Sequence, residues 1–184
     1  MRFVRQTLVG MGQQNIILIG LMAVGKSTVG KHMAGILGRE FYDSDRVIEE
    51  RAGADTTWIF DVEGEQGFRD RETHVLSELT ALEGVVIATG GGAVLRKENR
   101  TCLSKGGIVV HLDSSLKQLV ERTRHDKKRP LLKGGNREQI LRTLWEERTQ
   151  LYASIADYRF TASRSGPKQF AQKIVNQLQN DGLL

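Results

Sequence analysis

The stretch Gly20-Leu-Met-Ala-Val-Gly-Lys-Ser-Thr28 decides how this chain folds. It matches the pattern G-x-x-x-x-G-K-[ST] in full. A continuous apolar run, Ile16–Ile19, precedes it, as is typical of a strand buried on both faces of a parallel sheet. Residues 26–37 follow with apolar side chains at helical spacing and with Gly38 just past their end, which predicts a helix. We therefore expect a strand, a tight glycine-rich loop and a helix in succession.

Such a loop binds phosphate groups through its backbone. Glycines let consecutive N–H groups wrap closely around an anion, and the helix N-terminus adds the positive end of its dipole. In this pattern the lysine, Lys26, reaches the β- and γ-phosphates, and the hydroxyl of Ser27 is a ligand for Mg²⁺. We expect ATP or GTP, with Mg²⁺, to be bound by Ala23, Val24, Gly25, Lys26, Ser27 and Thr28.

Two other classes of phosphate-loop protein do not fit the rest of the sequence. A GTPase carries an Asn-Lys-x-Asp guanine motif, which this chain lacks. The segment Asp61-Val-Glu-Gly64 matches the loose D-x-x-G pattern, but it follows a helical run, so we interpret it as a helix end. A motor ATPase needs far more chain than 184 residues. The remaining readings are a small kinase and a non-catalytic ATP-binding regulator.

Length, charge and cysteine content exclude several further kinds of protein. The length suits one domain with a buried core. The net charge is +5, but Lys and Arg are scattered apart from the run at 127–129, so we expect no nucleic-acid partner. No apolar run approaches the length of a membrane span, and we expect no membrane partner. The single cysteine, Cys102, is interpreted as structural; it rules out an internal disulfide and is compatible with the cytoplasm.

Strand and helix patterns alternate along the chain, which indicates an α/β fold with a largely parallel sheet. Residues 1–14 are interpreted as an extension rather than a signal peptide, and 15–184 as a single domain. The further expected strands are 40–42, 85–88, 108–112 and 158–161. The further expected helices are 46–52, a short one around 58–60, 65–82 with Phe68, Val75, Leu76, Leu79 and Leu82 inward, 97–105, 115–124, 137–154 and 168–179. Residues 125–135 read as a loop.

The acceptor of the phosphate is sought where the strands end, because ligands of parallel sheets sit beyond the carboxyl ends of the strands. Asp43-Ser-Asp45 and Thr89-Gly-Gly-Gly92 both follow expected strands. Asp45 is a candidate to orient a substrate hydroxyl and take up its proton, and Asp43 to assist Mg²⁺ through water. Helix capping is the alternative for this pair. The three glycines suit close approach to a ligand, or form a plain turn.

Three arginines are candidate anion ligands, because the planar guanidinium matches carboxylates and phosphates. Arg69 lies early in an expected helix, within Phe68-Arg-Asp-Arg-Glu72. Arg129 precedes Pro130-Leu-Leu in the expected loop, and Arg148 begins Arg148-Thr-Gln-Leu-Tyr152. A solvated surface position is the ordinary alternative for each of them.

These motifs, in this order and spacing, resemble the shikimate kinase family over about residues 15–180. The resemblance implies a three-layer P-loop NTPase fold with a five-stranded parallel sheet flanked by helices. It implies transfer of phosphate from ATP to shikimate, in the biosynthesis of chorismate and aromatic amino acids, with Mg²⁺. A cytoplasmic monomer is expected.

The resemblance also implies roles for individual residues. Asp45, Arg69, Gly91 and Arg148 would hold shikimate, with the two arginines facing its carboxylate. Asp45, Lys26 and Arg129 would be the catalytic residues, and Ser27 and Asp43 would serve the metal. A mobile lid over residues 124–136 would carry Arg129 to the phosphates and exclude water. Arg122 would flank the adenine, and Ser165, beside Arg164, would line its pocket.

Two alternatives stay open from the residues alone. A kinase of the same architecture with another acceptor, such as gluconate or a nucleoside monophosphate, shares the phosphate loop. Gluconate also shares a carboxylate and hydroxyls with shikimate. A regulator that binds ATP without turnover is the other reading, against which the intact Lys26, Ser27 and Asp45 argue.

Overall fold

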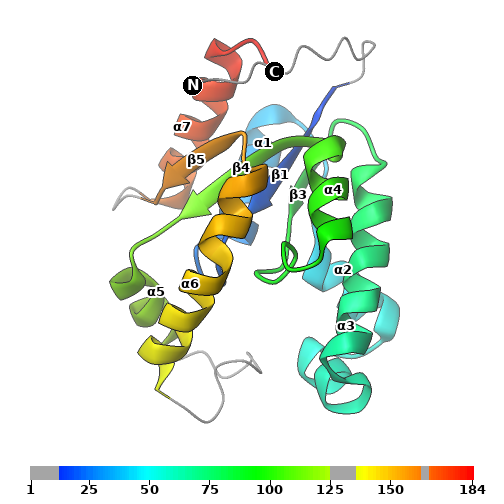
Figure 1. Cartoon of the computed structure of the whole chain (residues 1–184). Coiled ribbons are helices and arrows are strands. Elements are labelled where there is room, and N and C mark those ends of the chain that lie inside the picture. Colours follow the sequence, from blue (N-terminus) through cyan, green and yellow to red (C-terminus); the bar gives the residue numbers. More distant parts are fainter. Residues whose placement is uncertain (1–12, 125–135, 163–165) are drawn as a thin grey trace.

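The computed structural model describes residues 13–124, 136–162 and 166–184. Within them a single parallel sheet has the strand order β2-β3-β1-β4-β5 (Figure 1). The strands are β1 (Asn15–Ile19), β2 (Phe41–Asp43), β3 (Val86–Ala88), β4 (Gly107–Asp113) and β5 (Tyr158–Thr161). The helices are α1 (Lys26–Leu37), α2 (Ser44–Ala52), α3 (Thr56–Thr80), α4 (Lys97–Gly106), α5 (Leu116–Thr123), α6 (Arg137–Ile155) and α7 (Pro167–Asn180).

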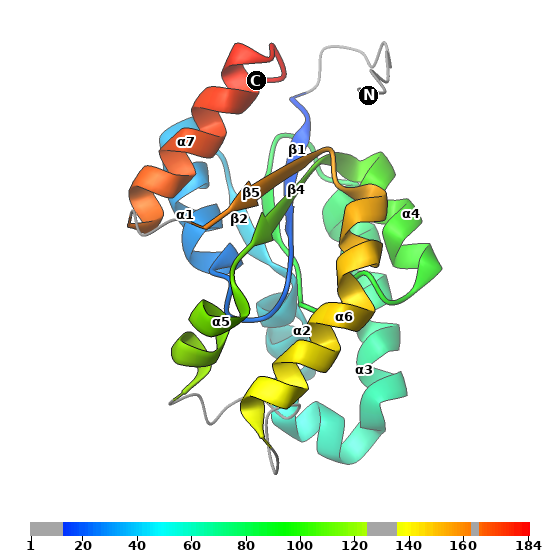
Figure 2. The ribbon, with the colours of Figure 1, turned by 60° about the vertical axis from the view of Figure 1, so that its left-hand side comes forward.

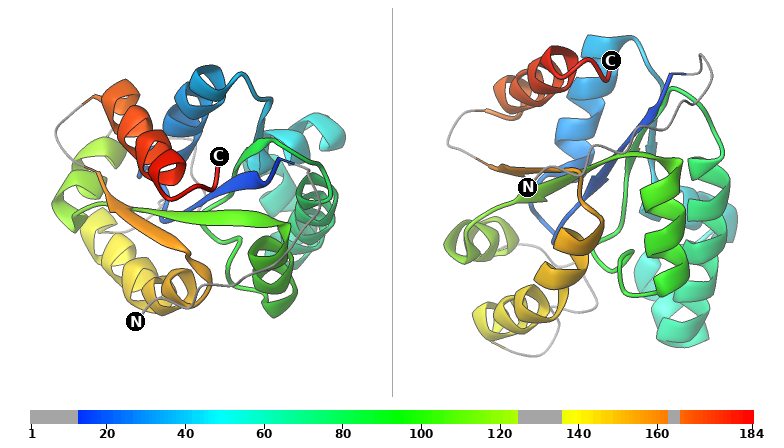
Figure 3. Two further views of the ribbon diagram at one scale, coloured as in Figure 1. Left: turned by 90° about the horizontal axis from the view of Figure 1, so that it is seen from above. Right: turned by 45° about the horizontal axis from the view of Figure 1, so that its top comes forward.

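The central strand divides the core into two layers. Ile16 and Leu18 of β1 point into one apolar cluster, while Ile17 and Ile19 point into the other, as the alternation of a strand requires. The first cluster joins the sheet to α1 and α7, and the second joins it to α3 and α4. Figure 3 shows the sheet between these two layers of helices. The expected three-layer architecture is therefore confirmed.

Parallel pairing brings the strand ends together at one edge. β1 pairs with β3 and with β4, so that Leu18 lies opposite Ala88 on one side and Val110 on the other. β2 pairs with β3 in the same direction, with Asp43 opposite Ala88. The loops that follow β1, β2 and β3 therefore leave the sheet as neighbours. Figure 2 shows α2, α5 and the first halves of α3 and α6 at this end of the molecule.

The expected elements are found with small shifts in their bounds. The helix over 26–37 is α1, and Gly38 ends it in the left-handed conformation with φ 64°. The segment around 58–60 and the helix from 65 are joined as α3, with a kink at Gly64 (φ 72°, ψ 179°). The prediction that Leu82 points inward is wrong, because Leu82 is 39% exposed. The helix α3 ends at Thr80, so helical spacing does not extend to this residue.

The structure also bears on membrane-spanning helices, on Cys102 and on the two segments that were expected as an extension and a lid. No helix in the described ranges combines the length and the apolar character that crossing a bilayer requires. Cys102 lies on α4 with its Sγ 2.8 Å from the Oγ1 of Thr80, at the packing of α4 against α3. Most of the expected extension 1–14 and the interior of the expected lid, 125–135, lie outside the described residues.

Candidate functional site

The loop between β1 and α1 has the backbone that its glycines predict. Gly20 (φ 142°) and Gly25 (φ 106°) have positive φ, and Ala23 (φ 61°) is the one described residue other than glycine in that region. A Cβ at Gly20 would overlap the carbonyl of Leu112 on β4, so only glycine fits there. The helix α1 begins at Lys26, directly after the loop, and directs its N-terminal N–H groups into it.

The side chain of Lys26 is folded onto this loop. Its Nζ donates to the carbonyl oxygens of Gly20 at 2.7 Å and Leu21 at 3.0 Å, and the residue is 8% exposed. The ammonium group is therefore held inside the loop, where the phosphate-loop pattern places it for contact with phosphate oxygens.

Asp43, at the end of β2, serves two neighbours at once. Its Oδ2 accepts a hydrogen bond from Ser27 Oγ at 2.5 Å, and its Oδ1 accepts one from the backbone N–H of Asp45 at 3.1 Å. The second bond caps the N-terminus of α2. Capping and a place beside the phosphate loop, which the sequence presented as alternatives, therefore coexist in this one side chain.

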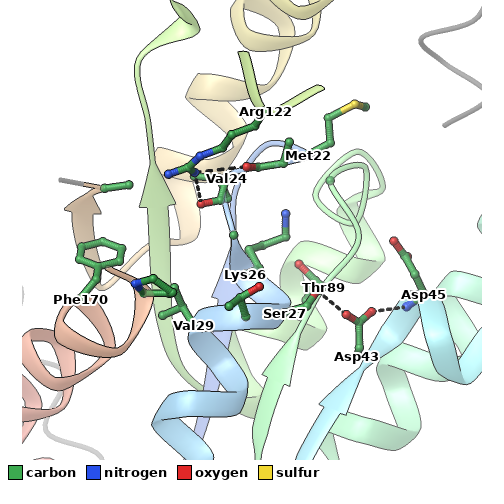
Figure 4. A pocket seen from close by; sticks show the side chains of 16 residues that line it. Met22, Val24, Lys26, Ser27, Val29, Asp43, Asp45, Thr89, Arg122 and Phe170 are labelled. Carbon is green, nitrogen blue, oxygen red and sulfur yellow. Dashed lines mark hydrogen bonds between the residues drawn. The ribbon is translucent and has the colours of Figure 1, made fainter. Parts of the chain in front are cut away.

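A pocket of about 520 Å³ opens beside the loop. Figure 4 shows Lys26, Ser27, Asp43 and Asp45 facing it from α1, β2 and α2. Arg122 of α5 reaches its rim and donates from Nη1 to the Val24 carbonyl at 2.9 Å. The lining residues are Met22, Ala23, Val24, Gly25, Lys26, Ser27, Thr28, Val29, Asp43, Asp45, Thr89, Gly91, Arg122, Ala162, Pro167 and Phe170.

The glycine-rich segment after β3 lies directly against these groups. The N–H of Gly90 donates to Ser44 Oγ at 3.0 Å. A Cβ at Gly90 would lie 2.5 Å from Asp45 Oδ1, and one at Gly91 would lie 3.1 Å from the N–H nitrogen of Met22. A Cβ at Gly92 would overlap the guanidinium of Arg69. Gly90 and Gly92 thus leave no space for a Cβ beside the site's own side chains, and Gly91 packs closely on the backbone of Met22.

Arg69 of α3 is buried in an ion pair. Its Nη1 donates to Oε2 of Glu72 at 2.8 Å, and Glu65 bonds its outer edge. Burial lowers the pKa of Arg69, but the attraction of Glu72 and Glu65 outweighs this and raises it. Burial raises the pKa of Glu72, which is fully buried, and the charges of Arg69, Arg148 and Arg96 act against that rise. The guanidinium of Arg69 therefore lies next to Gly92 with its charge paired to two carboxylates.

Arg148 and Tyr152, one turn apart on α6, meet the same glycine segment. Arg148 Nη1 donates to the carbonyl oxygen of Gly91 at 3.2 Å, and the hydroxyl of Tyr152 donates to it at 2.6 Å. Both residues are buried, and the ring of Tyr152 stacks on His111 of β4 with centroids 5.0 Å apart. Within the described part of the chain, Arg148 Nε and Glu72 Oε1 are buried without a hydrogen-bond partner.

The structure brings most of the expected site residues to one edge of the sheet. Asp45 lies in the pocket, and Arg69 and Arg148 lie behind it, in contact with the glycine segment. Arg129 and Ser165, expected at the phosphates and the adenine, lie outside the described residues. The lid expected over 124–136 is described only at its ends, where Arg124 caps α5 and Asn136 caps α6.

Several residues of this site had no role assigned from the sequence. Ser44 holds Gly90, Glu72 pairs with Arg69, Tyr152 holds Gly91, and Phe170 lines the pocket. Two of them carried a signal, because Glu72 follows Arg69 by three residues and Tyr152 follows Arg148 by four, which are the spacings of one helix face. Ser44 and Phe170 carried none.

Comparisons with known proteins agree on one family. The family model of shikimate kinase matches residues 22–179. The chain is similar to a shikimate kinase of Vibrio parahaemolyticus, with 51% identity over 167 residues that cover 91% of this chain and 97% of the relative. A shikimate kinase of Chromohalobacter salexigens is 51% identical over 166 residues, covering 90% and 92%.

Solved structures give the same answer. The shikimate kinase of Acinetobacter baumannii in complex with shikimate superposes with a TM-score of 0.90 at 47% identity, covering 93% of this chain and 96% of that one. The enzyme of Aquifex aeolicus gives a TM-score of 0.79 at 34% identity, covering 92% and 99%. With its phosphate loop, its acidic residue in the pocket and its buried arginines in place, this chain belongs to the shikimate kinase family, whose members are ATP-dependent kinases.

Proposed function

We propose that this chain transfers the γ-phosphoryl group of ATP to the 3-hydroxyl of shikimate, giving ADP and shikimate 3-phosphate for chorismate and aromatic amino-acid biosynthesis. The observation that carries the proposal is the convergence of two kinds of site on one edge of the sheet. The phosphate loop lines a pocket that also holds Asp45, and two buried arginines, Arg69 and Arg148, lie behind the adjoining glycines.

The donor side holds the triphosphate. Main-chain N–H groups of residues 23–28 surround the phosphates, and Lys26 exchanges the carbonyls of Gly20 and Leu21 for phosphate oxygens. Arg122, Ala162 and Phe170 border the part of the pocket proposed for the adenine. Arg129 and Ser165 remain predictions on this side, because they lie outside the described residues.

The residues present fit a magnesium ion. Ser27 Oγ and Asp43 Oδ2 are 2.5 Å apart in the pocket, and Mg²⁺ prefers such oxygen ligands. No group of three or more His, Cys, Asp or Glu side chains in the described ranges forms a cage for a metal. This suits Mg²⁺, which is bound by one or two protein oxygens together with phosphates and water. When bound, the ion neutralises charge that builds up on the phosphate oxygens.

The acceptor side orients the alcohol. We assign the carboxylate of shikimate to Arg69 and Arg148, since buried guanidinium groups recognise carboxylates through paired hydrogen bonds. The buried Nε of Arg148, unsatisfied by the described residues, supports a ligand there. Gly91 is assigned to a substrate hydroxyl. Asp45 accepts a hydrogen bond from the attacking hydroxyl and takes its proton as the new O–P bond forms and the bond to ADP breaks.

We further infer a monomeric, cytoplasmic enzyme without nucleic-acid or membrane partners. The large apolar side chains that are exposed in the described residues, Trp58, Val62, Leu82 and Trp145, are few and lie on α3, on α6 and in the loop after α3. Monomeric proteins carry scattered exposed residues of this kind without an interface.

The test is ADP production by the purified chain with ATP and Mg²⁺, measured without an acceptor, with shikimate and with gluconate. We expect ADP release that depends on shikimate, and phosphate transferred to its 3-position by NMR of the product. Release that depends only on gluconate would identify the related kinase. No release with either acceptor, while ATP still binds, would identify a regulator.

A further inference from the structure

The hydroxyl of Tyr152 lies against the glycine segment of the site and beside Arg148. This hydroxyl donates at 2.6 Å to the carbonyl oxygen of Gly91, the shorter of the two bonds which that oxygen accepts from α6. The ring is 2% exposed and is held by stacking on His111. Burial raises the pKa of the Tyr152 hydroxyl well above its ordinary value, so the group stays protonated and remains a donor.

The carbonyl of Gly91 belongs to the central peptide unit of a turn, which the N–H of Ala93 closes onto the carbonyl of Gly90 at 3.2 Å. The unit joins Gly91 to Gly92, and neither has a Cβ to restrict rotation of the backbone on either side. A carbonyl and the N–H of the same planar peptide point in opposite directions, so fixing the oxygen fixes the N–H of Gly92. Rotation of the unit by half a turn would aim the oxygen where the N–H had been.

Such a rotation would change the character of the acceptor site. Gly91 lines the pocket, and Gly92 packs against the guanidinium of Arg69. A carbonyl oxygen aimed at the carboxylate of a bound acid would repel it, because both groups only accept hydrogen bonds, whereas an N–H attracts it. The bond from α6 therefore selects the orientation of the glycine segment that can accept an anionic sugar-like ligand.

We propose that Tyr152 is a positioning residue for the acceptor: its hydroxyl locks the Gly91–Gly92 peptide with its carbonyl toward α6 and its N–H toward the substrate. This rests on the proposed shikimate kinase function. Arg148 also holds this carbonyl, through the longer bond, but it is assigned to the carboxylate of the acceptor as well. Tyr152 is the one of the two that we assign to positioning alone.

The first test is Tyr152→Phe, which keeps the ring and its stacking and removes only the donor. We expect the KM for shikimate to rise about three- to tenfold, as loss of one neutral hydrogen bond predicts. The KM for ATP should stay unchanged, and so should the melting temperature to within a few degrees. Tyr158→Phe is the matched control, because its hydroxyl bonds Asp181 at 2.7 Å, between β5 and the end of α7. That variant should leave both KM values unchanged.

The outcomes separate the inference from the proposed function. A wild-type chain without shikimate-dependent ADP release refutes the function. An active wild type with an unchanged shikimate KM in Tyr152→Phe refutes the lock, as does an equal rise of both KM values. Amide NMR of the free protein tests the lock without any acceptor: Gly92 should give one sharp signal in the wild type and in Tyr158→Phe, and a broadened or doubled signal in Tyr152→Phe. A single unshifted signal in that variant refutes it.

Discussion

The two halves of the site, which we assign to the phosphate donor and to the acceptor, are built in opposite ways. The donor half is one continuous stretch, residues 20–28, and its anion-binding groups are main-chain N–H groups together with one lysine. The acceptor half is collected from four separate places: Asp45 at the start of α2, Arg69 and Glu72 on α3, the glycines after β3, and Arg148 and Tyr152 on α6. Its groups are mostly buried side chains held by one another.

The two halves should therefore differ in their sensitivity to substitution. A substitution changes a side chain and leaves the main-chain N–H groups of the glycine loop in place. Buried charges are costly unless each has its partner, so the acceptor half depends on complete pairing. Substitutions in the acceptor half should therefore change turnover, the KM for shikimate or the free energy of unfolding, and should leave the affinity for ATP unchanged. The following variants test this expectation.

The largest effect is expected from Asp45→Asn, because an amide cannot take the proton of the attacking hydroxyl. Turnover should fall about 10³-fold, within the range that a general base contributes. ATP affinity, measured by calorimetry, should not change if the two halves are independent. Asp61→Asn, an exposed position on α3, is the control and should be fully active. Near-normal turnover in Asp45→Asn would remove this residue from its assigned role.

Glu72→Gln should lower stability next most strongly. The amide keeps the shape but leaves the buried guanidinium of Arg69 without its nearest counter-charge, at a cost of about 3 kcal/mol in the free energy of unfolding. Glu65→Gln is the matched control, since Glu65 bonds the same arginine with a side chain that is 58% exposed, and it should cost about 0.5 kcal/mol or less. Urea unfolding measures both. Equal losses would contradict the importance of burial.

His111, under the ring of Tyr152, should make the acceptor half sensitive to acid. Burial lowers its pKa from 6.5 to about 4, with Arg159 and Lys26 adding to the shift and Asp113 opposing it. The unfolded chain therefore binds more protons than the folded one between these values, so stability falls as the pH drops below 6.5. At about pH 5 the loss should be about 2 kcal/mol.

His111→Phe isolates this contribution, because it keeps a stacking ring that does not titrate. The difference in unfolding free energy between the variant and the wild type should be constant above neutral pH and shift by about 2 kcal/mol in favour of the variant at about pH 5. Denaturant titrations at several pH values measure it. A difference that does not vary with pH would show that His111 titrates normally in the folded protein.

The smallest of these effects is expected from Arg148→Lys. One ammonium cannot reproduce the paired donors of a guanidinium, so the KM for shikimate should rise about tenfold while the KM for ATP stays the same. Arg142→Lys, six residues earlier on α6 and 57% exposed, is the control and should have no effect. An unchanged KM for shikimate in Arg148→Lys would count against the carboxylate assignment.

The same contrast explains what the sequence could predict. The strand before the loop, the bounds of α1 and its glycine cap follow from local patterns, and the structure has them as expected. The residue types made Arg69 and Arg148 candidates for anion binding, but their assignment to the acceptor came from the resemblance, because nothing near them in sequence says which way they point. Their neighbourhood is set by strand order, which brings β3 between β1 and β2.

What the sequence did not supply are contacts between distant residues. Ser44 meets Gly90 across 46 positions, and Tyr152 meets Gly91 across 61. Both are side chain to backbone bonds, which leave no pattern in a single sequence. The wrong prediction at Leu82 has a local cause. No glycine or proline directly follows Thr80, so the sequence does not mark the end of α3.

The folded-back lysine of the phosphate loop bears on the stability of the loop itself. An ammonium group this deeply buried would oppose folding if it needed ATP as its partner. The carbonyl oxygens of Gly20 and Leu21 accept hydrogen bonds from Lys26, so this buried ammonium group has acceptors within its own loop and the fold of the β1-α1 unit does not depend on a phosphate to pair with it.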